Sequence, residues 1–73
     1  MTTLDIKGIC FAGGNVIVSA SELSPIELKS IALTAKECKV GMIVKHAYKL
    51  SSLSCKGIAL AGGPGTVTFD FTE

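Results

Sequence analysis

The chain has 73 residues, of which 48% are hydrophobic and 18% are charged, and its formal net charge at pH 7 is +1. This length allows one small domain, and the high apolar content excludes a disordered chain. The low net charge provides no bulk attraction to nucleic acid or to a membrane surface, and no apolar run is long enough to cross a bilayer. We therefore expect neither a membrane nor a nucleic acid as partner.

The cysteines and the single histidine are too dispersed to form a metal site. Cys10, Cys38 and Cys55 are widely spaced, and His46 has no second ligand at a metal-binding spacing. An odd number of cysteines without a secretory signal pattern indicates reduced thiols inside the cell. The sequence therefore predicts a cytoplasmic protein with no metal and no other cofactor.

A thirteen-residue pattern occurs three times along the chain. Its copies occupy residues 2–14, 24–36 and 51–63, and the first and third copies are identical at seven positions. Each copy is followed by a short run of β-branched residues. A repeat of this kind predicts a single domain of stacked supersecondary units. The three units cover about residues 2–20, 23–47 and 50–72.

Each unit begins with a helix-start signal and continues into a strand. Ser24 and Glu27 form the pattern of a capping box, Thr2 and Asp5 repeat that pattern in the first unit, and Ser51 can cap the third helix. Paired glycines after the first and third helices suit the left-handed conformation that ends a helix. In chain order we predict a helix over residues 3–12, a strand over 15–20, a helix over 25–37, a strand over 40–46, a helix over 52–61 and a strand over 66–71.

Apolar residues at helical spacing predict one face of each helix that packs on the sheet. This face comprises Ile6, Ile9, Cys10 and Gly13; Leu28, Ile31, Ala32 and Ala35; and Cys55, Ile58, Ala59 and Gly62. We expect Cys10 and Cys55 to act there as small hydrophobic residues, and Cys38, at a helix end, to be more exposed. A second apolar pair in each helix could contact neighbouring helices. These pairs are Leu4 and Phe11, Ile26 and Leu33, and Leu53 and Leu60.

Helices that alternate with strands across short links predict a parallel sheet with right-handed crossovers. Sequential stacking gives the strand order one, two, three with all helices on one face, which is a small three-turn α/β solenoid. The strand residues expected to face the helices are Val16, Val18, Met42, Val44, Val67, Phe69 and Phe71. Those expected on the outer face are Ile17, Ser19, Ile43, Lys45, Thr68 and Asp70.

One segment of the chain resembles a leucine-rich repeat. The segment has the pattern Val16-x-Val18-x-x-Ser21-x-Leu23, followed by Leu28 and Ile31. The family has Asn or Cys where this chain has Ser21 and, in the next unit, Tyr48. The resemblance covers the whole chain in architecture and about one unit in motif. It implies a binding surface on the exposed face of the sheet.

Three lysines occupy the same position in the three units, namely Lys7, Lys29 and Lys56. Stacking would align them in a row with neighbours about 10 Å apart, the usual distance between packed helices. Such a row could bind an acidic protein surface, phosphates or nucleic acid, or it could be a solvated face that keeps the protein soluble. We favour the solvated face, because the aromatic residues that accompany lysines on single-strand binders are absent.

A second group of polar residues lies around the end of the second strand. Lys45, His46 and Tyr48 cluster there, and Asp70 is expected on the neighbouring strand. A histidine beside a carboxylate can act as an acid or a base, but a structural role fits a flat sheet better. The glycine-rich run before the last strand does not match a phosphate loop, which leads from a strand into a helix N-terminus.

These patterns predict a non-enzymatic interaction or assembly module that binds itself and another protein. The first and last strands would have unpaired outer edges, and no polar repeat caps the ends. We expect association through these ends, either as a two-fold dimer or as a head-to-tail ring or filament. Two alternatives stay open: a small inhibitor that docks on a larger macromolecular complex, and a small ligand-binding protein or enzyme that uses the His46 region.

Overall fold

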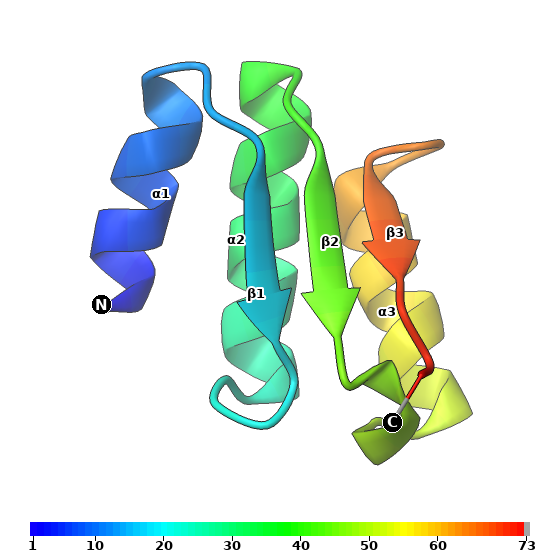
Figure 1. Cartoon of the computed structure of the whole chain (residues 1–73). Helices are drawn as coiled ribbons and strands as arrows, with labels where there is room; N and C mark the ends of the chain where they lie inside the picture. The colour runs from blue at the N-terminus through cyan, green and yellow to red at the C-terminus, as the bar shows by residue number, and fades with distance from the viewer. Residues whose placement is uncertain (73) are drawn as a thin grey trace.

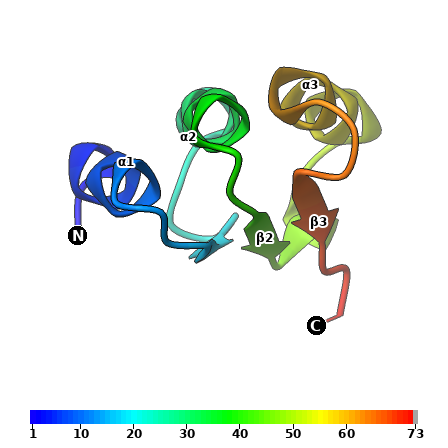
Figure 2. The ribbon, with the colours of Figure 1, turned by 90° about the horizontal axis from the view of Figure 1, so that it is seen from above.

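The computed structural model describes residues 1–72 and shows three helices packed on one face of a three-stranded parallel sheet (Figures 1 and 2). In chain order the elements are α1 (Thr3–Phe11), β1 (Val16–Ser19), α2 (Pro25–Cys38), β2 (Met42–Lys45), the 3-10 helix η1 (Ala47–Lys49), α3 (Ser52–Gly62) and β3 (Val67–Phe69). The strands lie in the order β1-β2-β3, as predicted. The α/β class and the parallel sheet are therefore confirmed, whereas η1 was not predicted.

The predicted helix starts are capped as their sequences indicate. At α1 the Asp5 amide donates to Thr2 Oγ1 over 3.2 Å, and the Thr2 amide donates to Asp5 Oδ2 over 3.0 Å. Ser24 and Glu27 form the equivalent capping box at α2. At α3, Ser51 Oγ accepts from the first-turn backbone. These bonds satisfy amides that have no partner inside the helix, which fixes where each helix begins.

The register of the sheet aligns equivalent residues of the three units. Val16, Met42 and Val67 lie side by side, and their side chains face the helices as predicted. The next row on this face consists of Val18, Val44 and Phe69. The side chains from β1 and β2 are buried, whereas those from β3 are half-buried. The helix-facing side of the sheet is therefore least covered at β3.

The strands are shorter than the sequence predicts, and the prediction that Phe71 lies on the inner face of the sheet is wrong. Phe71 is 59% exposed, because β3 ends at Phe69 and the chain leaves the sheet there. Beyond β3 the Asp70 carboxylate accepts hydrogen bonds from Thr72, which turns the chain locally. On the outer face the predicted exposure holds for four residues: Ile17, Ile43, Lys45 and Thr68. The other two, Ser19 and Asp70, are half-buried.

The core lies between the sheet and the central helix α2. The whole predicted face of α2 is buried, as are Cys10 of α1 and Ile58 of α3. Its fully buried members include Cys10, Leu28, Ile31, Ala32, Ala35 and Ile58. Gly62 is buried at the end of α3, where a Cβ would lie only 2.6 Å from Val67 Cγ2. Glycine at this position therefore lets α3 approach β3 closely.

The same prediction is wrong in part for the two outer helices. Ile9, Gly13 and Ala59 are exposed, and Cys55 is half-buried. The reason is position in the layer: α2 packs against both α1 and α3, whereas each outer helix has a helical neighbour on one side (Figure 2). Cys38 also differs from the expectation, because it is half-buried against the core.

The second apolar pair of each helix is exposed and is not buried against a neighbouring helix. The six side chains are between 48% and 81% exposed. They are Leu4, Phe11, Ile26, Leu33, Leu53 and Leu60. A spacing of seven residues keeps both members of a pair on one face of a helix, and here that face is the solvent side of the layer. Within residues 1–72, no helix combines the length and the apolar character that crossing a bilayer requires.

Candidate functional site

The three equivalent lysines differ in exposure, although all lie on the helical layer. Lys7 is half-buried, whereas Lys29 and Lys56 are exposed. The Lys29 side chain crosses from α2 to α3, because a Cβ built on Gly57 would lie 2.7 Å from Lys29 Cε. The end of the Lys29 side chain, Cε and Nζ, therefore lies over the joint between the two helices. The predicted lysine row is thus partly a packing feature.

The polar residues around β2 are brought together by the ends of the parallel strands. Ser19 Oγ and His46 Nδ1 share a hydrogen bond of 2.9 Å between the carboxyl ends of β1 and β2. The His46 and Tyr48 rings make an edge contact with their centroids 6.1 Å apart. Sequence reasoning missed Ser19 as a member of this group. The pairing of β1 with β2 places Ser19 beside Lys45, the residue before His46, so the register between these two strands is the information that identifies Ser19.

Asp70 belongs to the same end of the sheet but serves mainly its own turn. Its Oδ1 accepts from the Thr72 hydroxyl over 2.6 Å and from the Thr72 amide over 2.9 Å. These bonds lower the pKa of Asp70, and the positive charge of Lys45 lowers the pKa further by a smaller amount. The Asp70 carbonyl also accepts from the Ala47 amide over 3.0 Å, which attaches η1 to the end of β3.

His46, Tyr48 and Asp70 line neither of the two described cavities. The other members of this polar group, Ser19 and Lys45, line the larger cavity, and neither lines the smaller one on the outer face of the sheet. Among residues 1–72, no cluster of three or more histidine, cysteine or acidic side chains could hold a metal ion. The geometry therefore provides a hydrogen-bonded polar corner without an enclosed space for a substrate.

Cys10 is a buried hydrophobic residue, as predicted. Burial raises the pKa of its thiol, and the nearby Cys38 thiol raises it further. A raised pKa keeps the thiol protonated and poorly nucleophilic at neutral pH. All three cysteines of the chain are free. Cys55, expected to be buried as well, is only half-buried at the outer end of the helical layer.

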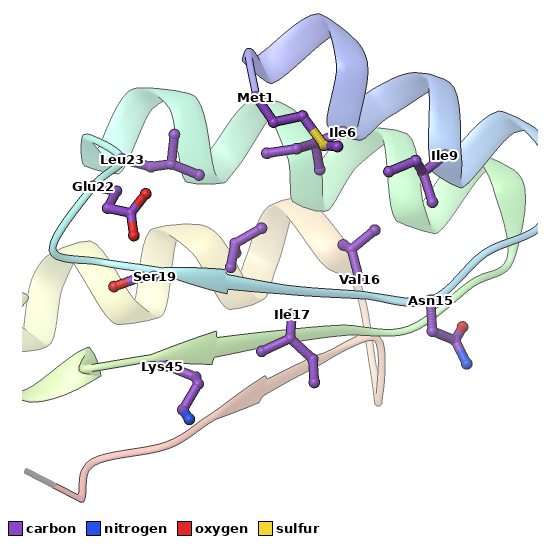
Figure 3. Close-up of a pocket in the computed structure, with 11 residues that line it drawn as sticks. Met1, Ile6, Ile9, Asn15, Val16, Ile17, Ser19, Glu22, Leu23 and Lys45 are labelled. Carbon is purple, nitrogen blue, oxygen red and sulfur yellow. The ribbon is translucent and has the colours of Figure 1, made fainter.

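The larger cavity, of about 450 Å³, is a groove between α1 and the outer edge of β1 (Figure 3). Met1, Ile6 and Ile9 from the α1 segment form one wall, and β1 forms the other. The groove is lined by side chains from both faces of β1, Val16 and Val18 on one face and Ile17 on the other. It therefore runs along the unpaired edge of the strand.

Both outer edges of the sheet present unpaired backbone groups. The amides of Val16 and Ala20 donate to β2, so the alternation along a strand turns the N–H groups of Ile17 and Ser19 away from it. At the other end, Asp70 donates to β2, which leaves the groups of Phe69 facing outward. Among residues 1–72, no further strand covers either edge. The sheet is thus open at β1 and at β3.

Comparison of this chain with models of protein families, with curated proteins and with solved structures finds no match.

Proposed function

We propose that this protein is a non-enzymatic interaction module, built as a small solenoid of three stacked helix–strand repeats, that assembles with itself and docks on another protein. The observation that carries the proposal is the open edge of β1 with an apolar groove beside it. The repeat pattern of the sequence and the resemblance of the segment from Val16 to Ile31 to a leucine-rich repeat support the solenoid. The three free thiols support a reducing compartment such as the cytoplasm.

Strand edges support this proposal on physical grounds. An uncovered edge is a template for pairing with another chain, and proteins normally shield it with charges, prolines or bulges. Neither β1 (Val16–Ser19) nor β3 (Val67–Phe69) contains a charged residue or a proline. A domain of this size also buries a small share of its surface by itself, so association with another surface adds stability that the monomer lacks.

The enzyme or ligand-binding alternative has weaker support. It requires a cavity beside His46, and neither described cavity is lined by that residue. The hydrogen bond between Ser19 and His46 instead connects two strand ends, which is a structural contact. An interaction module uses the surfaces that are open, and those surfaces are at the edges of the sheet.

Sedimentation velocity tests the proposal. We expect the wild-type chain to form dimers or larger species at high micromolar concentration. Ile17→Pro removes an amide that faces the open edge, so it should shift the chain toward monomer without breaking the bond network with β2. Ile17→Thr, the matched control, shortens the same side chain but keeps the amide, and it should associate like the wild type. A wild-type chain that stays monomeric throughout would contradict the proposal.

A further inference from the structure

The open side of α1 exposes positions that are covered in the other two helices. In the repeat alignment, α1 has Gly8, Ile9, Ala12 and Gly13 where α2 has Ser30, Ile31, Thr34 and Ala35 and α3 has Gly57, Ile58, Ala61 and Gly62. All four residues of α1 are exposed, whereas the eight equivalents are buried or half-buried. Within residues 1–72, a preceding helix–strand unit covers α2 and α3 on this side, whereas no such unit covers α1. We call this side the front end.

The open side of α3 shows the opposite pattern. Ala59 is exposed, whereas its equivalents Cys10 and Ala32 are completely buried. At the position of Leu28, which is completely buried in α2, both Ile6 of α1 and Cys55 of α3 are half-buried. The position of Ala59 is covered in α1 and α2, where another helix–strand unit follows. We call this side, together with β3, the back end. Within the described residues, the front end therefore lacks a preceding unit, and the back end lacks a following unit. The back end of another copy could take the place of the first, and the front end of another copy could take the place of the second.

The contacts between helices show what each end lacks. Lys29 of α2 lies over Gly57 of α3. At the back end Lys56, the equivalent of Lys29, has no following helix on which to lie. At the front end Gly8, the equivalent of Gly57, has open space, because a Cβ built there meets no atom within 4 Å. The back end therefore has the lysine of such a contact, Lys56, and the front end has the glycine, Gly8.

A second contact has the same polarity. Thr3 Oγ1 of α1 donates to Glu27 Oε2 of α2 over 3.0 Å. In the repeat alignment Ser52 of α3 is the equivalent of Thr3, and Asp5 of α1 is the equivalent of Glu27. The back end thus presents another hydroxyl donor, and the front end presents another carboxylate acceptor. Both residues are exposed.

The strand edges fit the same arrangement. In each existing pair, residues equivalent to Val67 turn their backbone groups toward the following strand, and residues equivalent to Ile17 turn theirs toward the preceding strand. A parallel pairing of β3 with β1 of another copy would therefore continue the ladder with complementary donors and acceptors. The same register would align Val67 with Val16 and Phe69 with Val18 on the helix-facing side.

We infer that copies of this chain associate head to tail, with α3 and β3 of one copy packed on α1 and β1 of the next. This inference rests on the self-association proposed above and assigns its polarity. Head-to-tail contact continues the sheet and the helical layer across copies, and it closes into a ring or extends as a filament. A two-fold contact between back ends would instead bring Lys56 toward its own copy, with like charges opposed.

The test uses two variants, each blocked at one end. Gly8→Arg fills the open space at the front end and repels Lys56, whereas Ala59→Arg blocks the back end at a position that the joint would bury. Leu53→Arg is the control, because it adds the same charge at an exposed position on the outer face of α3. Circular dichroism first establishes that all three variants are folded. Analytical ultracentrifugation then measures molar mass at a concentration where the wild type assembles.

If association is head to tail, Gly8→Arg and Ala59→Arg should each sediment at the monomer mass of 7.5 kDa. Their equimolar mixture should sediment at twice that mass, because each variant keeps the end that the other has lost. Leu53→Arg should assemble like the wild type. If Ala59→Arg alone forms a dimer, front ends pair with each other; if Gly8→Arg alone forms a dimer, back ends do. Either result overturns the polarity but keeps self-association, as does assembly of both variants to the wild-type size. A monomeric wild type overturns both proposals.

Discussion

Identical residues at equivalent positions of the repeat differ in burial, because different elements surround them. Ile9 and Ile31 occupy the same position of the repeat, but Ile31 is completely buried and Ile9 is 38% exposed. We predict that Ile31→Ala lowers the free energy of unfolding by about 2–5 kcal/mol, because it leaves a cavity in the core. Ile9→Ala should cost about 1 kcal/mol or less, since less apolar area is lost from a partly open site.

Urea unfolding at low micromolar concentration, where monomers dominate, measures both changes. A loss below about 0.5 kcal/mol for Ile31→Ala would show that this face of α2 does not form the core. Equal losses for the two variants would show that the front end of the molecule is as well covered as its centre.

The equivalent lysines provide a second prediction at the scale of residues. Changing Lys7, Lys29 and Lys56 together to Gln should leave the free energy of unfolding within about 1 kcal/mol of the wild type, as for surface substitutions generally. Gln lacks the Cε and Nζ atoms with which Lys29 lies over Gly57, but Lys29 is an exposed residue, so the loss of this contact should be small. Thermal unfolding monitored by circular dichroism checks this, and a much larger loss would reveal buried ion pairs at these positions.

Among the elements, α2 depends on a capping box whose carboxylate titrates. Hydrogen bonds from the Ser24 amide, and then from the Thr3 hydroxyl, lower the pKa of Glu27 below its ordinary value of 4.5. A carboxyl group with a lowered pKa in the folded state stabilises the fold above its unfolded pKa, and this contribution is lost as the pH falls through the folded pKa. We therefore predict that stability falls on acidification below about pH 4.5.

Glu27→Gln tests this contribution, since the single carbonyl oxygen of Gln can still accept the hydrogen bond from the Ser24 amide, whereas the side chain does not titrate in this range. Urea midpoints between pH 7 and pH 3 should fall less steeply for Glu27→Gln than for the wild type. Some decline should remain, because hydrogen bonds also lower the pKa values of Asp5 and Asp70. Parallel pH profiles for the two chains would be inconsistent with a role for Glu27 in the acid response.

An element can be predicted from the sequence where its bounds are set by residues close to it in the chain. The capping pairs at Ser24 and Thr2 are local, so the helices begin where the sequence predicts. Strand ends depend on where pairing stops, which is why β3 excludes Phe71. The exposure of Ile9 depends on the absence of a preceding unit, which periodicity along one helix cannot indicate. The contact between Ser19 and His46 required the register between two strands.

At the scale of the whole molecule, the parallel sheet and the helical layer stop abruptly at both ends. Within residues 1–72 the edges of β1 and β3 are unpaired, and the groove beside β1 is lined mainly by apolar residues, with Glu22 and Lys45 among its polar ones. A repeat architecture tolerates such ends when a capping unit or another molecule covers them. Because the front and back ends lack complementary parts of the same contact, we propose a second copy of the chain as the surface that covers both.

The central claim is that these open edges become paired when copies assemble, and residue-resolved amide hydrogen exchange at two protein concentrations tests it most directly. In dilute solution the amides of Ile17 and Phe69 should exchange rapidly, whereas the amide of Val44 in the central strand should be protected. At high micromolar concentration the exchange of Ile17 and Phe69 should slow by at least about tenfold, equivalent to about 1.4 kcal/mol, with Val44 protected as before. Rapid exchange of Ile17 and Phe69 at both concentrations would contradict the claim.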